Sequence, residues 1–350
     1  MKHNIAFRVK GMSFLINKKG LYVFSAALII LIAVIIASTA LGDMNMSMIE
    51  AAKSIFGGGT SLHNLVVRSF RLPRILLAAF AGMALAVSGA ILQGIVRNPL
   101  ASPDIIGITG GASFTTVCFL ALFNINDKGV SISIAWLPLA SFAGAILSGL
   151  LVYFLAHKKS ILSPFRLVLI GIGLSAGTEA LTKFVMLIGP VYLASKANTW
   201  MTGSVNGASW PQVTALAIWF TVFFIITFIL ARRLNILELG EAVPVSLGSS
   251  SNKDKKILLI ISAALTGGAV AFAGGIGFVG LMAPHMARKL VGSAYGALIP
   301  VSALIGGILV IISDTIGRTV FLPLEVPAGV LTSAIGAPYF VYLLYKSRNH

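Results

Sequence analysis

Long apolar stretches separated by short polar segments run through almost the whole sequence. A membrane-spanning helix needs about 20 apolar residues, and ten stretches reach or approach that length. They are Leu21–Leu41, Ile75–Ile95, Ile105–Phe123, Ile134–Ala156, Leu167–Leu193, Pro211–Ala231, Ile257–Gly277, Gly280–Ala297, Leu298–Ser313 and Val326–Tyr345. The pattern predicts an all-α, polytopic membrane protein with about ten transmembrane helices in a single domain. A cytoplasmic segment (1–20), a helix bundle (21–345) and a cytoplasmic tail (346–350) would make up that domain.

The composition excludes two other classes of protein. Of the 350 residues, 57% are apolar and 10% are charged, against roughly 25% charged residues in a soluble domain. A soluble protein could not hide this much apolar surface, and a disordered chain would contain far less of it. The 36 glycines favour closely packed membrane helices. The one cysteine, Cys118, excludes an intrachain disulfide and disfavours a cysteine-based zinc or redox site.

The basic residues indicate the orientation of the chain. With the N-terminus in the cytoplasm, 18 of the 26 lysines and arginines fall in cytoplasmic segments. Cytoplasmic loops of membrane proteins carry such an excess, so we expect both termini inside and an even number of crossings. The same bias explains the formal charge of +16 without a nucleic-acid partner. The first stretch is too long for a signal peptide and is expected to remain as a helix.

Part of the sequence repeats itself. After a shift of 185 positions, small residues and prolines of the second stretch coincide with those of the seventh. The pairs are Gly82 with Gly267, Ala86 with Ala271, Gly89 with Gly274, Ile91 with Ile276 and Pro99 with Pro284. A second block, at a shorter offset, aligns Gly144 with Gly306. The two units would cross the membrane in opposite directions, which predicts an inverted repeat of helices 2–5 and 7–10, as in many transporters. Chance similarity between glycine-rich helices is the alternative.

Two arginines stand at the outer end of the second stretch. Arg71 and Arg74 lie one helical turn apart, and Pro73 between them suits the start of a helix. Arginines on that side are either anchors at the membrane surface or a docking surface for acidic groups of a partner. Prolines and polar residues after the helices are candidates for breaks that take part in gating. These candidates are Asn98, Pro99, Pro284 and His285.

Four segments, in this order, resemble the motifs of the FecCD family. The members of that family are permease subunits of bacterial ATP-binding-cassette importers for ferric siderophores, haem and vitamin B12. The segments are WMTGSVNGASW (Trp200–Trp210), LNILELGEAVPVSLG (Leu234–Gly248), GGIGFVGLMAPHMARKLVG (Gly274–Gly292) and SDTIGRTVFLPLEVPAGVLTSAIGAPYFVYLL (Ser313–Leu344). The resemblance extends over nearly the whole chain.

The resemblance implies roles for two sets of residues. Arg71, Arg74 and Arg318 match positions that face the external binding protein and pair with its acidic residues. Segment 234–248 matches the loop that sits in a groove of the ATPase. The matching residues there are Leu234, Asn235, Leu239, Gly240, Glu241, Leu247 and Gly248. Pro244 stands where the family usually has alanine, and a proline would bend or shorten a short helix.

The resemblance also implies partners and a location. It predicts a multi-pass protein of the bacterial cytoplasmic (inner) membrane that works with ATPase subunits and an extracytoplasmic siderophore-binding protein or lipoprotein. A second permease chain, identical or homologous, would complete a pathway at the interface between the two chains. A ferric siderophore is the expected substrate, with haem and a corrinoid such as vitamin B12 left open. No cofactor is expected.

Two alternative functions, a secondary transporter and an intramembrane enzyme, each depend on a single polar residue. Glu179 could couple proton flow to transport in a secondary transporter, but Lys183, four residues later, could neutralise it. His285 could serve an intramembrane enzyme, but the residues near it offer no second metal ligand, which favours a structural role. Asp314 and Arg318 are also four residues apart and are expected to pair. The sequence lacks GxxxxGK[ST] and HExxH motifs, and nothing places its serines and histidines in a catalytic set, so the chain is not expected to be an enzyme.

Overall fold

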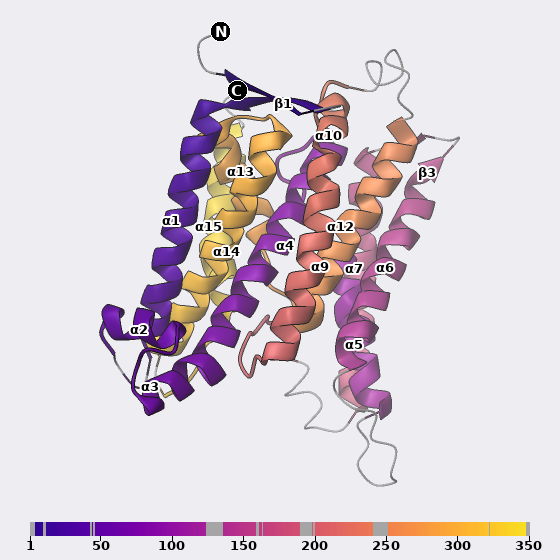
Figure 1. Ribbon diagram of the computed structural model, residues 1–350. Coiled ribbons are helices and arrows are strands. Elements are labelled where there is room, and N and C mark those ends of the chain that lie inside the picture. The colour runs from indigo at the N-terminus through magenta and orange to yellow at the C-terminus, as the bar shows by residue number, and fades with distance from the viewer. Residues whose placement is uncertain are drawn as a thin grey trace.

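Each of the ten apolar stretches corresponds to one helix of the computed structural model (Figure 1). The structure describes residues 4–9, 12–42, 44, 46–123, 136–158, 161–162, 164–189, 198, 200–240, 251–321 and 323–347. The ten helices are α1 (Lys18–Ala40), α4 (Leu72–Val96), α5 (Ile108–Phe123), α6 (Leu137–Ala156), α7 (Pro164–Ile188), α9 (Trp210–Ile229), α12 (Ser251–Ala273), α13 (Val279–Val291), α14 (Tyr295–Thr319) and α15 (Ala328–Ser347). Among the described residues, eight helices are long and apolar enough to cross a membrane. The shorter two are α5 and α13, with 16 and 13 residues.

Short elements accompany these helices. Two short helices and a π-helix lie between α1 and α4, and one further helix follows α9. They are α2 (Met48–Ile55), α3 (Ser61–Leu65), the π-helix η1 (Val66–Arg71) and α10 (Ala231–Glu238). Two antiparallel hairpins are formed by β1 (Asn4–Val9) with β2 (Met12–Asn17) and by β3 (His157–Lys158) with β4 (Ile161–Leu162). Ser47 caps α2, and its hydrogen bonds hold the pKa of the Glu50 carboxyl below its ordinary value.

One predicted boundary was wrong. The ninth helix begins at Tyr295, not at Leu298, and it continues through Pro300 to Thr319. The turn before it is made by Gly292, whose positive φ of 81° ends α13. Pro300 lies in the second turn, where it removes one internal hydrogen bond, and α14 continues through it.

The two repeat units pack against each other reciprocally. The first helix of one unit lies against the third helix of the other: α4 packs on α14, and α12 packs on α6. A Cβ atom on Gly82 would lie 2.2 Å from the Gly306 carbonyl oxygen, and one on Gly267 would lie 2.7 Å from the Ala145 Cβ. The first helices of the two units, α4 and α12, also contact each other. At this contact the Ser88 hydroxyl lies 2.7 Å from the Ser262 hydroxyl. This exchange of partners is what a pseudo-two-fold relation between inverted repeats requires.

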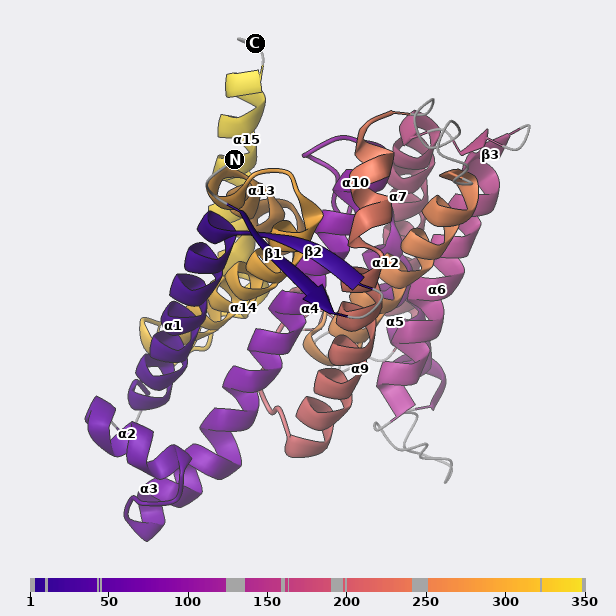
Figure 2. The same cartoon turned by 45° about the horizontal axis from the view of Figure 1, so that its top comes forward.

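The bundle has two distinct ends. The start of α1, the end of α15 and the short helix α10 lie at one end, whereas α2 and α3 lie at the opposite end (Figure 1). Figure 2 shows α2 and α3 beside the end of α1, away from α5, α6 and α7. We call these the terminal end and the far end. A chain that begins and ends on the same side agrees with an even number of crossings.

Candidate docking and coupling sites

The three arginines of the predicted docking surface come together at the far end, from η1, α4 and α14. Two of them are buried and cap the last turn of α1. Arg71 donates to the Thr39 and Met44 carbonyl oxygens, each at 2.7 Å. Arg318 donates to the Leu41 carbonyl oxygen at 2.7 Å and also to the Ser38 carbonyl oxygen. The last carbonyls of a helix have no partner within the helix and carry partial negative charge, so both guanidinium groups stabilise this helix end.

Arg74 is engaged differently, because its partners are carboxylates. Its Nε and Nη2 donate to the Asp314 carboxylate at 2.9–3.1 Å, and its Nη1 donates to Glu325 Oε2 at 2.9 Å. Asp314 also lies 3.8 Å from Arg318 Nε, which confirms that this i, i+4 pair is in contact. Three guanidinium groups therefore meet two carboxylates, which leaves the cluster with an excess of positive charge.

These residues line a recess that opens at the far end. It has a volume of about 400 Å³ and is lined by Gly42, Met44, Val66, Phe70, Arg71, Arg74, Asn206, Gly207, Ala208, Arg318 and Glu325. The Trp210 indole N–H donates to the Arg68 carbonyl oxygen at 2.8 Å, which joins the 200–210 segment to η1 at the rim. Glu325 and Asn206 were missed by the sequence analysis. Both stand inside quoted motifs, but nothing in one sequence indicates that either would face an arginine from α4.

At the terminal end, α10 carries the first part of the predicted ATPase-coupling segment. Leu234 is fully buried, whereas Leu239 is exposed. Asn235 accepts the backbone N–H of Tyr295 at 2.9 Å and so supplies a cap that α14 lacks within its own sequence. Gly240 ends the described part with a φ of 112°. The other predicted coupling residues, Glu241, Leu247 and Gly248, lie outside the described residues.

Charged side chains connect α10 to its neighbours. Arg288 of α13 donates to Glu238 at 2.6 Å and reaches the Tyr295 hydroxyl at 3.5 Å. Arg233 donates to Asp254 of α12 at 2.5 Å. These links join α10 to three helices of the second repeat unit, so a displacement of α10 would be passed on to them. The sequence analysis quoted Glu238 and Arg288 within motifs but did not pair them.

The two helix breaks differ from each other. Asn98 and Pro99 follow the end of α4, as predicted, and Arg97 before them adopts a left-handed conformation with φ 54°. Pro284 lies inside α13, so the prediction that it breaks its helix was wrong. The break comes before α13, between Gly274 and Phe278. Pro284 has no N–H for the Gly280 carbonyl, and that carbonyl instead faces α4 so closely that a Cβ on Gly89 would lie 1.8 Å from its oxygen.

The breaks meet at a carboxylate that the sequence analysis did not identify. Asp104 accepts the Thr109 hydroxyl of α5 at 2.8 Å and the Phe278 backbone N–H at 3.4 Å. Phe278 has a φ of 65°, which is uncommon for a residue other than glycine. A Cβ on Gly336 of α15 would lie 2.3 Å from the Phe278 Cβ. The starts of α5 and α13 and the middle of α15 therefore converge at one junction.

The surroundings of the other polar candidates, Glu179, Lys183 and His285, suit structural roles. Glu179 and Lys183 are exposed on α7 and form a hydrogen bond at 2.6 Å, which confirms that they neutralise each other. The His285 ring lies edge-on to the Tyr339 ring at 5.9 Å. The part of the chain that the structure describes contains no group of three His, Cys, Asp or Glu side chains that could hold a metal ion.

Comparisons with known proteins identify the family. The sequence matches the model of the FecCD transport family over residues 30–346. It is 53% identical over 333 residues to the probable siderophore transport system permease protein YfhA of Bacillus subtilis, covering 95% of this chain and 97% of that protein. It is 40% identical to the iron(3+)-hydroxamate import system permease protein FhuG of the same organism, covering 95% and 98%. A solved structure of a metal-chelate type ABC transporter in an inward-facing conformation superposes with a TM-score of 0.81, at 29% identity, and covers 93% of this chain and 99% of that one.

Proposed function

The chain belongs to the FecCD transport family, and from that premise we propose that it is the permease subunit of an ATP-binding-cassette importer for a ferric siderophore. It is a multi-pass protein of the bacterial cytoplasmic membrane. It is not itself an enzyme, since ATP hydrolysis in such importers belongs to separate subunits. The observation that carries the substrate class is the 53% identity, over nearly the full length of both chains, to a permease named for siderophore transport.

Transport assays test this function. Proteoliposomes that contain the permease and its ATPase should take up a ferric siderophore only with internal ATP and a loaded binding protein outside. Uptake driven by a pH gradient alone would instead support a secondary transporter. The hydrogen bond between Glu179 and Lys183 argues against that alternative, because a paired, exposed carboxylate is poorly suited to relay protons.

For docking, we propose that the recess at the far end receives an acidic side chain of the binding protein. Arg74 is the residue suited to bind this acidic side chain, because its present partner Glu325 has a side chain that is 40% exposed and can be displaced. Arg71 and Arg318 act behind it by holding the end of α1 and by adding positive charge. The orientation predicted from the basic residues places this recess outside the cell.

Replacing Arg74 by glutamine should weaken docking of the binding protein by about 30-fold, which corresponds to about 2 kcal/mol. Glu325→Gln should have the opposite effect and tighten docking by about three-fold, because it removes a competing carboxylate from Arg74. Affinity of the purified binding protein for the reconstituted permease measures both. Lys53→Gln, at the same end but outside the recess, is the control. Unchanged affinity in both recess variants would refute the docking site.

At the terminal end, we propose that the ATPase moves α10 and that Arg288 transmits this movement to α13. The half-length helix α13 then carries the movement to the junction at Asp104, where α5 and α15 begin to separate or approach. The apolar side chains of α1, α7, α9 and α15 are largely exposed in one chain. A second permease chain would contact some of these faces, which would put the pathway between the two copies. Helices that rock as connected bodies are a common way to alternate between outward and inward openings.

Arg288→Gln should uncouple transport from ATP hydrolysis without releasing the ATPase. The number of substrate molecules moved per ATP should fall about five-fold or more, because α10 would no longer carry α13 with it. The charge-reversed pair Glu238→Arg with Arg288→Glu should restore part of the coupling. Lys289→Gln changes the neighbouring exposed charge and is the control. A normal transport-to-ATP ratio in Arg288→Gln would show that this link does not transmit the movement.

A further inference from the structure

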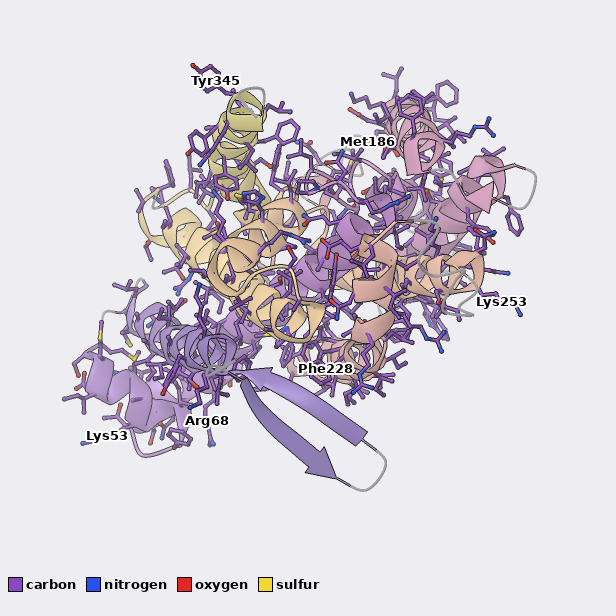
Figure 3. All side chains as sticks on the ribbon, turned by 90° about the horizontal axis from the view of Figure 1, so that it is seen from above. Lys53, Arg68, Met186, Phe228, Lys253 and Tyr345 are labelled. Atoms are coloured by element: carbon purple, nitrogen blue, oxygen red, sulfur yellow. The ribbon has the colours of Figure 1, made fainter. Side chains whose placement is uncertain are left out.

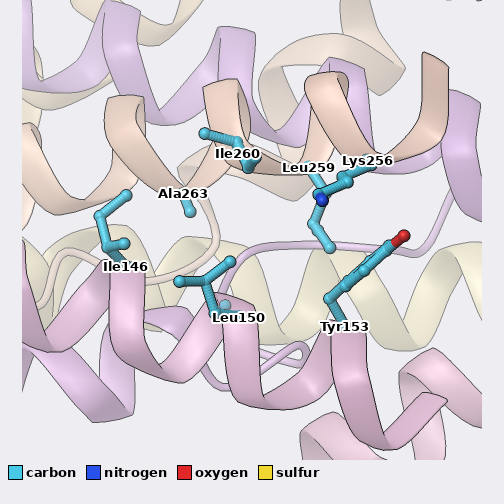
Figure 4. A pocket seen from close by; sticks show the side chains of 8 residues that line it. Ile146, Leu150, Tyr153, Lys256, Leu259, Ile260 and Ala263 are labelled. Carbon is cyan, nitrogen blue, oxygen red and sulfur yellow. The ribbon is translucent and has the colours of Figure 1, made fainter. Parts of the chain in front are cut away.

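Helices inside the bundle are packed too closely for a large solute to pass between them at the contacts described above. The space between α6 and α12 has a volume of about 10 Å³, which is room for about one water molecule. Figure 4 shows side chains that surround it, among them Ile146, Leu150 and Ile260. The contact of α4 with α13 is closer still, since a Cβ on Gly89 would lie 1.8 Å from the Gly280 carbonyl oxygen. These contacts point to an outer face of the chain as the route of a siderophore.

The outer faces of the bundle differ in charge. The helices α1, α7, α9 and α15 leave most of their side chains exposed. Among the described residues of these four helices, charged side chains lie more than four residues from a helix end only in α7. Seen from the terminal end, α7 with Met186 and α15 with Tyr345 lie on the same side of the bundle, opposite Phe228 of α9 (Figure 3). The exposed sides of α1 and α9 thus suit lipid, whereas that of α7 does not.

The charged residues within α7 are Glu179 and Lys183. Their side chains are 57% and 67% exposed. Glu179 stands nine positions before Ile188, about 14 Å along the helix from its far end. The hydrogen bond between the two side chains balances their charges, but it leaves both groups largely uncovered. Exposed charges at this depth are costly against lipid, and such residues usually face a polar cavity.

A polar edge of α7 includes this pair. Ser175, Glu179 and Lys183 follow one another at intervals of four, so they share one side of the helix. The Ser175 hydroxyl donates to the Asp104 carbonyl oxygen at 3.0 Å, which brings the edge to the junction of α5, α13 and α15. The helix is open nearby, because a Cβ on Gly177 would meet no described atom within 4 Å outside its own helix backbone and its chain neighbours.

We propose that this edge of α7 lines the substrate pathway and that Glu179 and Lys183 contact the ferric siderophore as it passes. The inference rests on the proposed function and on a pathway between two permease chains. The pair offers hydrogen-bond donors and acceptors without net charge, which suits a complex that is itself neutral. Iron(III) bound by three hydroxamate groups is neutral, whereas three catecholate groups leave a negative charge that Glu179 would repel. A contact with an exposed pair is also weak enough to release the solute.

Cysteine accessibility tests whether this edge faces water. In the permease–ATPase complex in vesicles, with Cys118→Ser as background, Ala176→Cys keeps the pair and lies on its side of α7. Water-soluble methanethiosulfonates added outside should modify it about ten-fold faster than Ile218→Cys, an exposed position of α9, because the reactive thiolate forms only in a hydrated site. Glu179→Cys leaves Lys183 alone and should react about three-fold faster with an anionic reagent than with a cationic one. Lys183→Cys should show the reverse preference.

Uptake of a ferric trihydroxamate, delivered by its binding protein, tests the contact with substrate. Glu179→Gln and Lys183→Gln each leave one charge unpaired and should lower uptake per ATP by about three-fold. The double variant is neutral again and keeps amide donors and acceptors, so it should recover most of the uptake. A pair that only stabilised α7 would instead leave the double variant as impaired as the single ones.

Three results would overturn the proposal. Equal modification of Ala176→Cys and Ile218→Cys would place this edge against lipid or a second chain. Equal rates with anionic and cationic reagents would mean that the pair exerts no charge on a passing solute. Wild-type uptake in both glutamine variants would exclude a contact with substrate. Each result is compatible with uptake that requires ATP and a loaded binding protein, so the proposed function would then stand without this pathway contact.

Discussion

Replacing Asp314 by alanine is expected to lower the stability of the permease by about 3–5 kcal/mol. The Asp314 side chain is 3% exposed, and it accepts hydrogen bonds from Arg74 while it lies beside Arg318. Without it, two neighbouring guanidinium groups would remain in a poorly hydrated site with less negative charge to balance them. The far ends of α4 and α14 should then separate, and α1 should lose part of its contact with them.

Thermal unfolding of the purified permease measures this effect. Glu325→Ala is the matched control, because it removes the other carboxylate partner of Arg74 from a more exposed position and should cost no more than about 1 kcal/mol. Asp314→Asn should fall between the two, since the amide keeps an oxygen acceptor. If Asp314→Ala and Glu325→Ala lowered the unfolding midpoint equally, the buried pair of Arg74 and Asp314 would contribute no more to stability than the exposed pair of Arg74 and Glu325.

Gly89→Ala is expected to be at least as damaging, although it adds one methyl group. The new Cβ would lie 1.8 Å from the Gly280 carbonyl oxygen and 2.5 Å from its carbonyl carbon. Overpacking a core typically costs about 1–3 kcal/mol. Here the new methyl group is fixed to the α4 backbone and would meet backbone atoms of Gly280, so neither side can rotate away. The helices α4 and α13 would have to move apart, which we expect to cost more than about 3 kcal/mol.

A glycine with free space around it provides the comparison. Among the described residues, no atom outside its own helix backbone and its neighbours in the chain lies within 4 Å of a Cβ placed on Gly296 of α14. Gly296→Ala should therefore be neutral or slightly stabilising, because alanine favours a helix more than glycine does. The yield of folded protein and its unfolding midpoint distinguish the two variants. Similar values for Gly89→Ala and Gly296→Ala would show that α4 and α13 are not in close contact.

The helices could be predicted from the sequence because apolar length alone determines most of them. Each of the ten stretches corresponds to a helix, and the two repeat units expected from the glycine pattern pack against each other reciprocally. Boundaries near proline were less predictable. Pro284 and Pro300 both lie inside helices, because the turns on either side of α13 are made by Gly274 and Gly292 with positive φ. One sequence does not show which residues of a glycine- and proline-rich segment adopt such a conformation.

The candidate site was predictable only in part. The motifs placed Arg71, Arg74 and Arg318 in one region, and the structure brings them together. Apart from the pair of Asp314 with Arg318, their present partners could not be predicted. These partners are backbone carbonyls at the end of α1 and carboxylates far away in sequence. Glu325, 251 positions from Arg74, is one such partner. The sequence analysis missed Asp104 for the same reason. Its role depends on the hydrogen bond that it accepts from the Phe278 backbone N–H, 174 positions later.

The arginine caps on α1 have a consequence for the order in which the protein is made. The far end of α1 is synthesised well before Arg318, which donates to the carbonyls of Ser38 and Leu41 and follows about 280 residues later. Until then those two carbonyl groups lack this donor, because Arg71 donates to the Thr39 and Met44 carbonyls instead. Completion of α14 thus attaches it to the far end of α1, and a polypeptide that stops before α14 would lack these hydrogen bonds at that end of α1.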